Sequence, residues 1–244
     1  MKKILSLARQ AIQKYNMIND GDVVAIGVSG GKDSLVLLKA MYELKNFYPQ
    51  KFGIKAVTID TGFDNSDFGA IENLCKDLDI EYLNYKTNIK EIVFDKLQKK
   101  SPCALCSKMR RAALCDAAKK LGCNKIALGH NYDDAIETYI MNILFNGKAM
   151  CFEPVTHYED KNISIIRPLV FVGEYTIKKC ASENKLPVAK KLCPADGNTK
   201  REETKKLLQQ IKKNNKNALK NIFTAILNSE EFKKYEVTTI DTDE

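Results

Sequence analysis

The chain has 244 residues, of which 44% are hydrophobic and 29% charged, as is typical of a globular protein with one large core. No apolar stretch is long enough to span a membrane, and polar residues interrupt the amphipathic N-terminus too early for a signal peptide. We therefore expect a cytoplasmic protein that has no membrane partner.

The net charge of +8 is concentrated towards the C-terminus. Between Lys178 and Lys234, fifteen Lys and Arg residues stand against six Asp and Glu, a balance of +9 that leaves the rest of the chain about neutral. A basic surface confined to one segment favours a polyanionic partner such as a nucleic acid. The alternative is a solvated, lysine-rich helix face.

Strand and helix patterns alternate through the first two-thirds of the chain. After a helix in residues 1–20, short apolar runs predict strands over residues 23–28, 55–60, 80–83, 124–129 and 163–168. Amphipathic stretches predict helices over residues 35–44, 71–78, 104–121 and 133–144, and lysine-rich helices follow residue 200 with a break at 214–215. This order predicts an α/β fold: a parallel sheet with helices on both faces and a short helical C-terminal extension. In such sheets the active site lies at the carboxyl ends of the strands.

A glycine-rich turn joins the first strand to the next helix, with the sequence Ser-Gly-Gly-Lys-Asp-Ser over residues 29–34. Two glycines allow a phosphate to approach the backbone, and the helix that follows directs its free N–H groups at the anion. Ser29, Lys32 and Ser34 add hydroxyl donors and a positive charge. The spacing differs from that of a Walker A loop and of a dinucleotide fingerprint. The alternative is a simple turn capped by Asp33 or Ser34.

This turn resembles the PP-loop of the ATP pyrophosphatases, the adenine-nucleotide α-hydrolase superfamily, whose members split ATP into AMP and pyrophosphate. A second block, Leu-Gly-His-Asn-Tyr-Asp-Asp-Ala-Ile-Glu-Thr over residues 128–138, fits the same resemblance. We expect ATP to bind at Ser29, Gly30, Gly31, Lys32, Asp33, Ser34, Asp60, Gly129 and His130, with Lys32, Asp33 and Asp134 as the catalytic residues. Acidic side chains here are suited to hold Mg²⁺, and Asp133 and Asp134 are equally suited to begin a helix. His130 is as often structural as functional at a strand end.

Eight cysteines without a secretory signal argue against a disulfide framework. Cys103 and Cys106 open a predicted helix, whose N-terminus favours thiolate over thiol. A single Cys-x-x-Cys is compatible with zinc, a redox disulfide or an iron–sulfur cluster. Cys193 lies in a loop of the basic segment that Pro194 and Gly197 bend.

Together, the motifs resemble the tRNA 2-thiocytidine synthetase branch of the PP-loop superfamily, over residues 20 to 228. They include the Arg pair after the Cys-x-x-Cys and the sequence Ile-Arg-Pro-Leu over residues 166–169. The resemblance implies thiolation of cytidine 32 of tRNA and a 4Fe–4S cluster on Cys103, Cys106 and Cys193. Many members carry a second Cys-x-x-Cys where this chain has Asp196, a difference that suits a cluster with one iron free of protein thiolate.

The resemblance also implies partners and a division of the chain. We expect tRNA as substrate, a cysteine desulfurase or free sulfide as sulfur donor, and a homodimer. RNA contacts are expected from Arg110, Arg111, Arg167, Lys190 and Lys191, although Arg167 is equally suited to pair within the core. The predicted divisions are an N-terminal helix (1–20), the PP-loop domain (21–190), a basic helical segment (191–236) and a disordered tail (237–244).

Three other functions use the same ATP loop. In the first, one of the three cysteines carries a persulfide and there is no cluster. In the second, an amide-forming enzyme or a lysidine-type tRNA ligase uses an amine nucleophile, which gives the three cysteines no role. The third is a non-catalytic ATP-binding partner protein, which intact Lys32, Asp33 and Asp134 disfavour.

Overall fold

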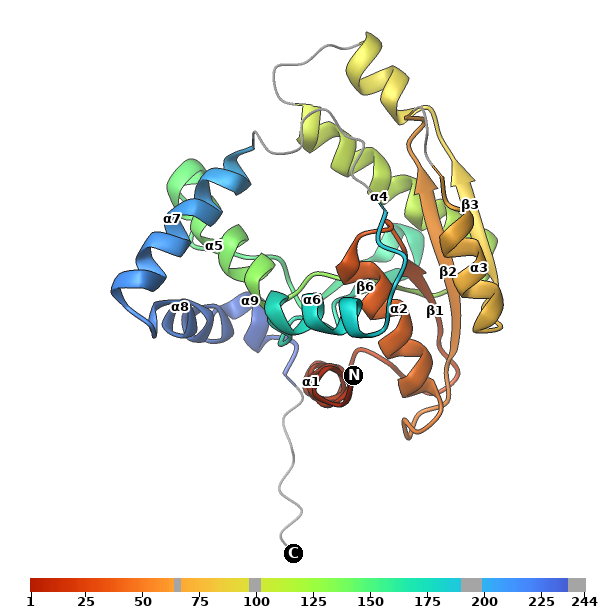
Figure 1. Cartoon of the computed structure of the whole chain (residues 1–244), viewed down its shortest axis with the longest axis horizontal. Helices are drawn as coiled ribbons and strands as arrows, with labels where there is room; N and C mark the ends of the chain where they lie inside the picture. The colour runs from red at the N-terminus through yellow and green to blue at the C-terminus, as the bar shows by residue number, and fades with distance from the viewer. Residues whose placement is uncertain (64–66, 97–101, 190–198, 237–244) are drawn as a thin grey trace, which may run out of the picture.

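The computed structural model describes residues 1–63, 67–96, 102–189 and 199–236 (Figure 1). The predictions for Lys190, Lys191, Cys193 and the tail over 237–244 lie outside these residues. In the part that the structure describes, no helix combines the length and the apolar character that a bilayer span requires.

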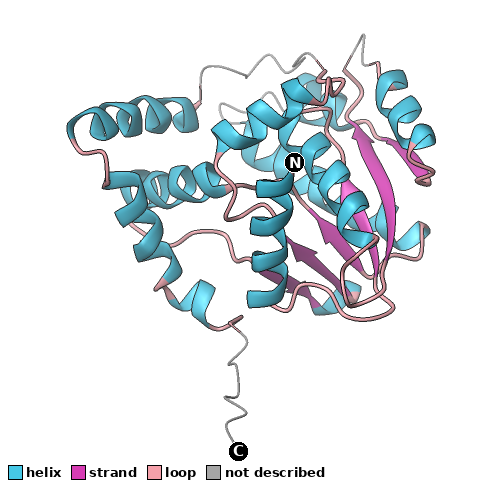
Figure 2. Cartoon of the chain, turned by 60° about the horizontal axis from the view of Figure 1, so that its bottom comes forward, coloured by secondary structure: helices cyan, strands magenta, loops and turns pink. Residues whose placement is uncertain are grey.

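A six-stranded sheet forms the centre of the molecule, with the strand order β3-β2-β1-β4-β6-β5 (Figure 2). Its strands are β1 (Val23–Gly27), β2 (Gly53–Asp60), β3 (Tyr82–Lys86), β4 (Lys125–Ala127), β5 (Val155–Tyr158) and β6 (Ile163–Ile166). The first four and β6 are parallel, as predicted, and Ile26 of β1 pairs with Ala56 on one side and Ala127 on the other.

Two strands differ from the prediction. β5 was not predicted; it pairs antiparallel with β6 at the edge of the sheet, and a short 3₁₀ turn, Glu159–Lys161, joins the two. Strand β3 begins at Tyr82 rather than at residue 80. The backbone N–H of Ile80 donates instead to the Cys75 carbonyl, and Asp79 takes a positive φ of 52°, so these residues end the preceding helix.

The predicted helices are present, together with helical elements that were not predicted. The helices are α1 (Lys2–Lys14), α2 (Lys32–Lys45), α3 (Gly69–Asp77), a π-helical turn (Glu91–Lys96), α4 (Pro102–Lys120), α5 (Tyr132–Asn146), α6 (Glu174–Glu183), α7 (Lys200–Asn214), α8 (Ala218–Leu227) and α9 (Glu230–Lys233). The π-helical turn, α6 and α9 were not predicted, although Ile177, Cys180 and Ala181 of α6 have helical spacing and are buried. Gly122 follows α4 with a φ of 69°, as expected of a residue that ends a helix.

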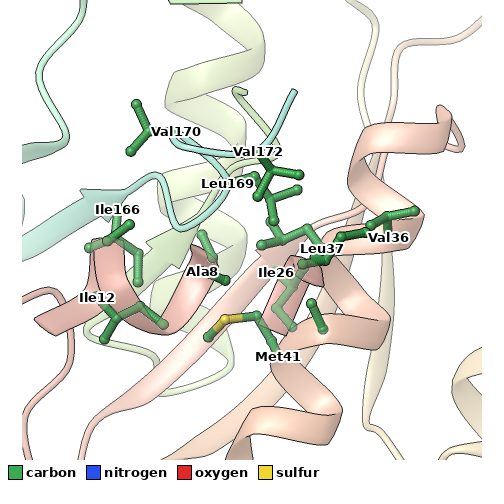
Figure 3. Packing of buried hydrophobic residues seen from close by; sticks show 14 of the residues in the cluster. Ala8, Ile12, Ile26, Val36, Leu37, Met41, Ile166, Leu169, Val170 and Val172 are labelled. Atoms are coloured by element: carbon green, nitrogen blue, oxygen red, sulfur yellow. The ribbon is translucent and has the colours of Figure 1, made fainter. Parts of the chain in front are cut away.

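Alternate residues of the strands face two separate apolar clusters, one on each side of the sheet. Val24 and Ile26 of β1 face the larger cluster, which α1, α2, α3 and α6 cover. Figure 3 shows Ile26 among side chains of α1 and α2, such as Ile12 and Met41. Ala25 faces the smaller one, formed with Leu114 and Ala118 of α4. This period of two is that of a strand buried on both faces, and it confirms the prediction of helices on both sides of the sheet.

The C-terminal helices join the larger cluster through aromatic side chains. Phe232 of α9 contacts Tyr15 after α1, with ring centroids 5.9 Å apart, and Phe223 of α8 contacts Tyr132 of α5 at 4.3 Å. The basic segment therefore packs against the sheet domain through its own hydrophobic residues.

A buried ion pair ties the amino ends of β1 and β4 together. Lys125, 8% exposed, pairs with Asp22, 5% exposed, at 3.0 Å, and also donates to the Met17 carbonyl at 2.8 Å. Asp22 further accepts hydrogen bonds from the Asn124 side chain and the Asn19 backbone N–H. Both oxygens of Asp22 thus have partners and the Lys125 ammonium has two, which a buried ion pair needs.

We expect Lys125→Met to lower the free energy of unfolding by about 3 kcal/mol, because it leaves the buried Asp22 carboxylate without its cation. Urea denaturation measures this change. Lys55→Met is the control, since Lys55 pairs with Glu81 at a partly exposed site where an ion pair stabilises little. Equal stability losses in the two variants would contradict this account.

Candidate active site

The predicted phosphate loop lies at the carboxyl end of β1 and leads into α2. Gly30 has a φ of 81°, a conformation that favours glycine. The Ser34 hydroxyl holds the turn, because it accepts a hydrogen bond from the Ser29 N–H at 3.1 Å and donates to the Gly31 carbonyl at 2.8 Å. The residue that begins α2, Gly31, has no capping side chain. The first-turn N–H groups of α2 are therefore left without a side-chain cap, as an anion site requires.

Two other parts of the chain pack against this loop. The N–H of Ala189, after α6, donates to the Gly30 carbonyl at 3.0 Å, and a β-carbon on Gly30 would lie 2.9 Å from that of Ala189. Gly129, after β4, lies so close to the first turn of α2 that a β-carbon would be 3.0 Å from the Asp33 carbonyl carbon. Both glycines are thus needed for close approach, and Gly30 is needed for the turn as well.

Asn131 connects the two predicted motifs and was not among the predicted site residues. Its side-chain oxygen accepts hydrogen bonds from the N–H groups of Asp133 and Asp134, while the Asp134 carboxylate accepts from the Asn131 N–H at 3.0 Å. This reciprocal arrangement is a capping box at the start of α5. The Asn131 side-chain nitrogen also donates to Asp33 at 3.0 Å, so the cap of α5 holds the first turn of α2.

Asp133 has a different role from Asp134. One of its carboxylate oxygens accepts a hydrogen bond from the N–H of Glu174, the first residue of α6, at 2.6 Å. It thereby supplies the cap that Gly173, which begins α6, does not. The alternative interpretation of the two aspartates is a helix N-cap with an acidic first turn. Both lie in the first turn of α5, as that interpretation expects, but the N-cap itself is Asn131. The prediction of a magnesium site stays a prediction.

Lys32 contacts two carboxylates. Its ammonium lies 3.0 Å from Asp33 and 2.9 Å from Glu174, which comes from α6. Burial acts to lower the pKa of Lys32, but the hydrogen bonds to Glu174 and Asp33 outweigh it, and the net effect raises that pKa. Lys32 is therefore a fully charged group at the mouth of the phosphate loop.

Two basic residues of α7 contact neighbouring carboxylates of the site. Arg201 lies 2.9 Å from Asp134 and 3.4 Å from Glu137, and it donates to the Thr138 hydroxyl at 3.1 Å. Lys205 lies 3.0 Å from Glu174 and 3.9 Å from Glu137. Burial raises the pKa of Glu137 to about 7, although both cations act to lower it. These four residues, Glu137, Glu174, Arg201 and Lys205, were missed from the sequence because they meet only in the folded chain.

His130 and Arg167 both lie against the Phe152 ring, with the His130 and Phe152 ring centroids 5.0 Å apart. Arg167, 6% exposed, donates to the Glu153 carbonyl and the Thr156 hydroxyl and lies over Phe152. It pairs within the core, so we correct its predicted role as an RNA contact. Burial, together with Arg167, lowers the pKa of His130 to about 3, and its Nδ1 atom is buried with no partner among the described residues. His130 is therefore neutral, and its predicted contact with ATP stays a prediction.

The remaining predicted residues lie on other elements. Asp60 ends β2, where its carboxylate accepts a hydrogen bond from the Gly62 N–H at 2.9 Å. Cys103 is exposed and Cys106 half-buried in the first two turns of α4, and both are free of disulfides. Arg110 and Arg111 are exposed further along α4, where Arg111 donates to the Tyr158 hydroxyl. Within the described ranges, no group of three His, Cys, Asp or Glu residues is arranged to hold a metal ion.

Comparisons with known proteins agree with the predicted PP-loop and the fold. A family model described as a PP-loop domain matches residues 4–211. The chain is 35% identical to the tRNA-cytidine(32) 2-sulfurtransferase of Geobacter sulfurreducens, over 93% of this chain and 90% of the relative. It is also 35% identical to the tRNA-cytidine(32) 2-sulfurtransferase of Dechloromonas aromatica, over 90% of this chain and 77% of the relative.

A solved structure shares the fold. The U34-tRNA thiolase NcsA from Methanococcus maripaludis, determined with its [4Fe-4S] cluster, matches this chain with a TM-score of 0.75 and 24% identity. The match covers 92% of this chain and 76% of that one. At this identity the likeness shows a shared arrangement of sheet and helices.

We expect Gly129→Ala to weaken ATP binding about tenfold, because the new methyl group displaces the first turn of α2 and one well-placed hydrogen bond to a charged group has about this effect. Isothermal calorimetry with ATP measures it. Gly53→Ala is the matched control, since a β-carbon there meets only Val23 at ordinary contact distance. Wild-type affinity in Gly129→Ala would refute the close-packing argument.

Proposed function

Because the chain belongs to the PP-loop family and, within it, to the family of the tRNA-cytidine(32) 2-sulfurtransferases, we propose that it uses ATP to thiolate cytidine 32 of tRNA. The observation that carries this proposal is the uncapped N-terminus of α2, set among Lys32, Asp33 and Asp134. A substrate of this kind would be met in the cytoplasm.

The first step is activation of the base. The O2 atom of cytosine attacks the α-phosphorus of ATP, the α–β anhydride bond breaks, and pyrophosphate leaves. The phosphates bind at the α2 N-terminus, where the N–H groups and Lys32 stabilise the charge that develops on them. Lys32 exchanges its contacts with Asp33 and Glu174 for contacts with phosphate oxygens.

Asp33 and Asp134 are the residues that would hold Mg²⁺ on the phosphates. Carboxylate oxygens are the ligands that Mg²⁺ prefers. In this structure each carboxylate has one oxygen bound to Asn131 and the other to a cation, Lys32 or Arg201. Mg²⁺ would therefore take the place of a side-chain cation, while Asn131 keeps both carboxylates in position.

In the second step a sulfur nucleophile adds to C2 of the base, the C2–O bond breaks, and AMP leaves with the oxygen. We infer that Cys103, Cys106 and Cys193 hold a 4Fe–4S cluster for this step. Cys103 and Cys106 fit such a group, because they lie three residues apart at the positive end of α4 and are soft thiolate ligands. When bound, the cluster would supply an iron without a protein thiolate that presents sulfide.

The RNA would contact exposed basic residues. Arg110 and Arg111 on α4 are exposed and remain the candidates within the described residues, and Lys190 and Lys191 are proposed with them. A cysteine desulfurase or free sulfide as sulfur donor, and association as a homodimer, complete the proposal.

Nucleoside mass spectrometry of tRNA tests the substrate. We expect cells that lack this protein to lose 2-thiocytidine, wild-type protein to restore it, and Lys32→Ala to fail, because it removes the cation of the phosphate loop. Lys39→Ala is the control, since Lys39 lies on the same helix but pairs with Glu43. Unchanged 2-thiocytidine in the deletion strain would overturn the assignment.

Anaerobic purification tests the cysteines. We expect a brown wild-type protein, and Cys103→Ser or Cys106→Ser should lose most of the bound iron, because a hydroxyl is a poor substitute for a soft thiolate ligand. Ser107→Ala, at the exposed neighbouring position, should retain the iron. An iron-free wild-type protein that still thiolates tRNA would favour the persulfide mechanism instead.

A further inference from the structure

Eight residues at the phosphate loop form a closed ring, in which each residue has a polar contact with the next. In order, with the distance to the next, they are Lys32 (3.0 Å), Asp33 (3.0 Å), Asn131 (3.0 Å, through its backbone N–H), Asp134 (2.9 Å), Arg201 (3.4 Å), Glu137 (3.9 Å), Lys205 (3.0 Å) and Glu174 (2.9 Å to Lys32). The ring includes both predicted motifs, the first residue of α6 and the first two turns of α7.

The charges of the ring show why α7 matters. Four carboxylates, of Asp33, Asp134, Glu137 and Glu174, stand against three cations, and two of those cations come from α7. Without Arg201 and Lys205, Lys32 alone would face four carboxylates beside the place where a polyanion binds. Burial strengthens the repulsion between such charges, because little water screens them.

The two α7 cations each bind a carboxylate of the active site. Arg201 binds the Asp134 oxygen that Asn131 does not hold, and reaches Glu137 and Thr138 with the same guanidinium. Lys205 binds one oxygen of Glu174, whose other oxygen binds Lys32. Lys205 therefore orients Glu174, which contacts Lys32 of the phosphate loop. Arg201 orients Asp134, which is linked to the loop through Asn131 and its hydrogen bond to Asp33.

We propose that Arg201 and Lys205 are positioning residues of the ATP site, so that α7 completes that site by neutralising its carboxylates and fixing Asp134 and Glu174. This inference rests on the ATP site of the proposed function. It assigns part of the basic C-terminal segment to ATP rather than to RNA. The two side chains are only partly exposed, whereas Lys206, the next residue along α7, is exposed.

Substitutions of Arg201 separate charge from geometry. We expect Arg201→Gln to raise the KM for ATP and to lower the kcat of tRNA-dependent pyrophosphate release, each about tenfold, the effect of one charge-assisted hydrogen bond. Arg201→Lys keeps the charge but reaches only one partner, since Arg is a planar fork and Lys a single point charge. It should restore the KM and leave the kcat low. Lys205→Gln should raise the KM and change the kcat little.

Lys206→Gln is the matched control, because it removes the same charge one residue further along the exposed side of α7. Helix α7 should stay docked in all variants, since Leu208 and Thr204 remain buried, and urea denaturation checks this. The inference is refuted if Arg201→Gln and Lys205→Gln behave like Lys206→Gln, or if Arg201→Lys restores both parameters or neither.

Calorimetry separates this inference from the proposed function. If the wild-type protein releases no pyrophosphate with any tRNA, the proposed function fails, yet ATP binding still reports on the ring. Weaker ATP binding by Arg201→Gln and Lys205→Gln than by Lys206→Gln would then support the inference. Equal ATP binding by all three would overturn it.

Discussion

The approach of Gly129 to the first turn of α2 is the constraint on which the rest of the site depends. A side chain there would meet the Asp33 backbone at 3.0 Å, so only glycine lets the end of β4 lie against the phosphate loop. This contact brings Asn131 within hydrogen-bonding distance of Asp33, at 3.0 Å. Asn131 then determines where α5 begins and where Asp134 points. A single close backbone contact thus sets the relative positions of the two motifs and, through Asp134, of α7.

The caps of the surrounding helices explain why an anion would bind at α2. Asn131 caps α5, Asp133 of that helix caps α6, and Thr199 caps α7. Each of these N-termini therefore has a side-chain partner, whereas α2 has none among the described residues. Free first-turn N–H groups carry part of the positive end of the helix dipole. The start of α2, next to Lys32, lacks the stabilisation that a side-chain cap provides. The starts of α5, α6 and α7 have it.

Sequence reasoning succeeded where the structure is local. A buried strand, a Gly-Gly turn and a helix are consecutive in the chain, so their order over residues 23–45 could be predicted. The same reasoning could have found Asn131, which stands three residues before Asp134 in a capping-box spacing. It could not find Glu174 or Arg201, because Lys32 and Asp134 are far from them in the chain. Arg167 shows the converse: its charge predicted RNA binding, and the fold buries it against Phe152.

Four carboxylates gathered beside one loop, with Glu137 buried, carry an energetic cost, and the ring explains how that cost is met. Removing a charge from water is expensive unless a partner compensates for it. Desolvation raises the pKa of Glu137 to about 7 even with Arg201 and Lys205 beside it, so that compensation is incomplete. A site that binds ATP needs carboxylates and cations that are free to contact it. The same groups would otherwise stay paired with one another. Contacts between partly exposed groups can be exchanged at modest cost, and those of Lys32, Arg201 and Lys205 are of this kind. The site is therefore held together by interactions that a bound nucleotide can replace.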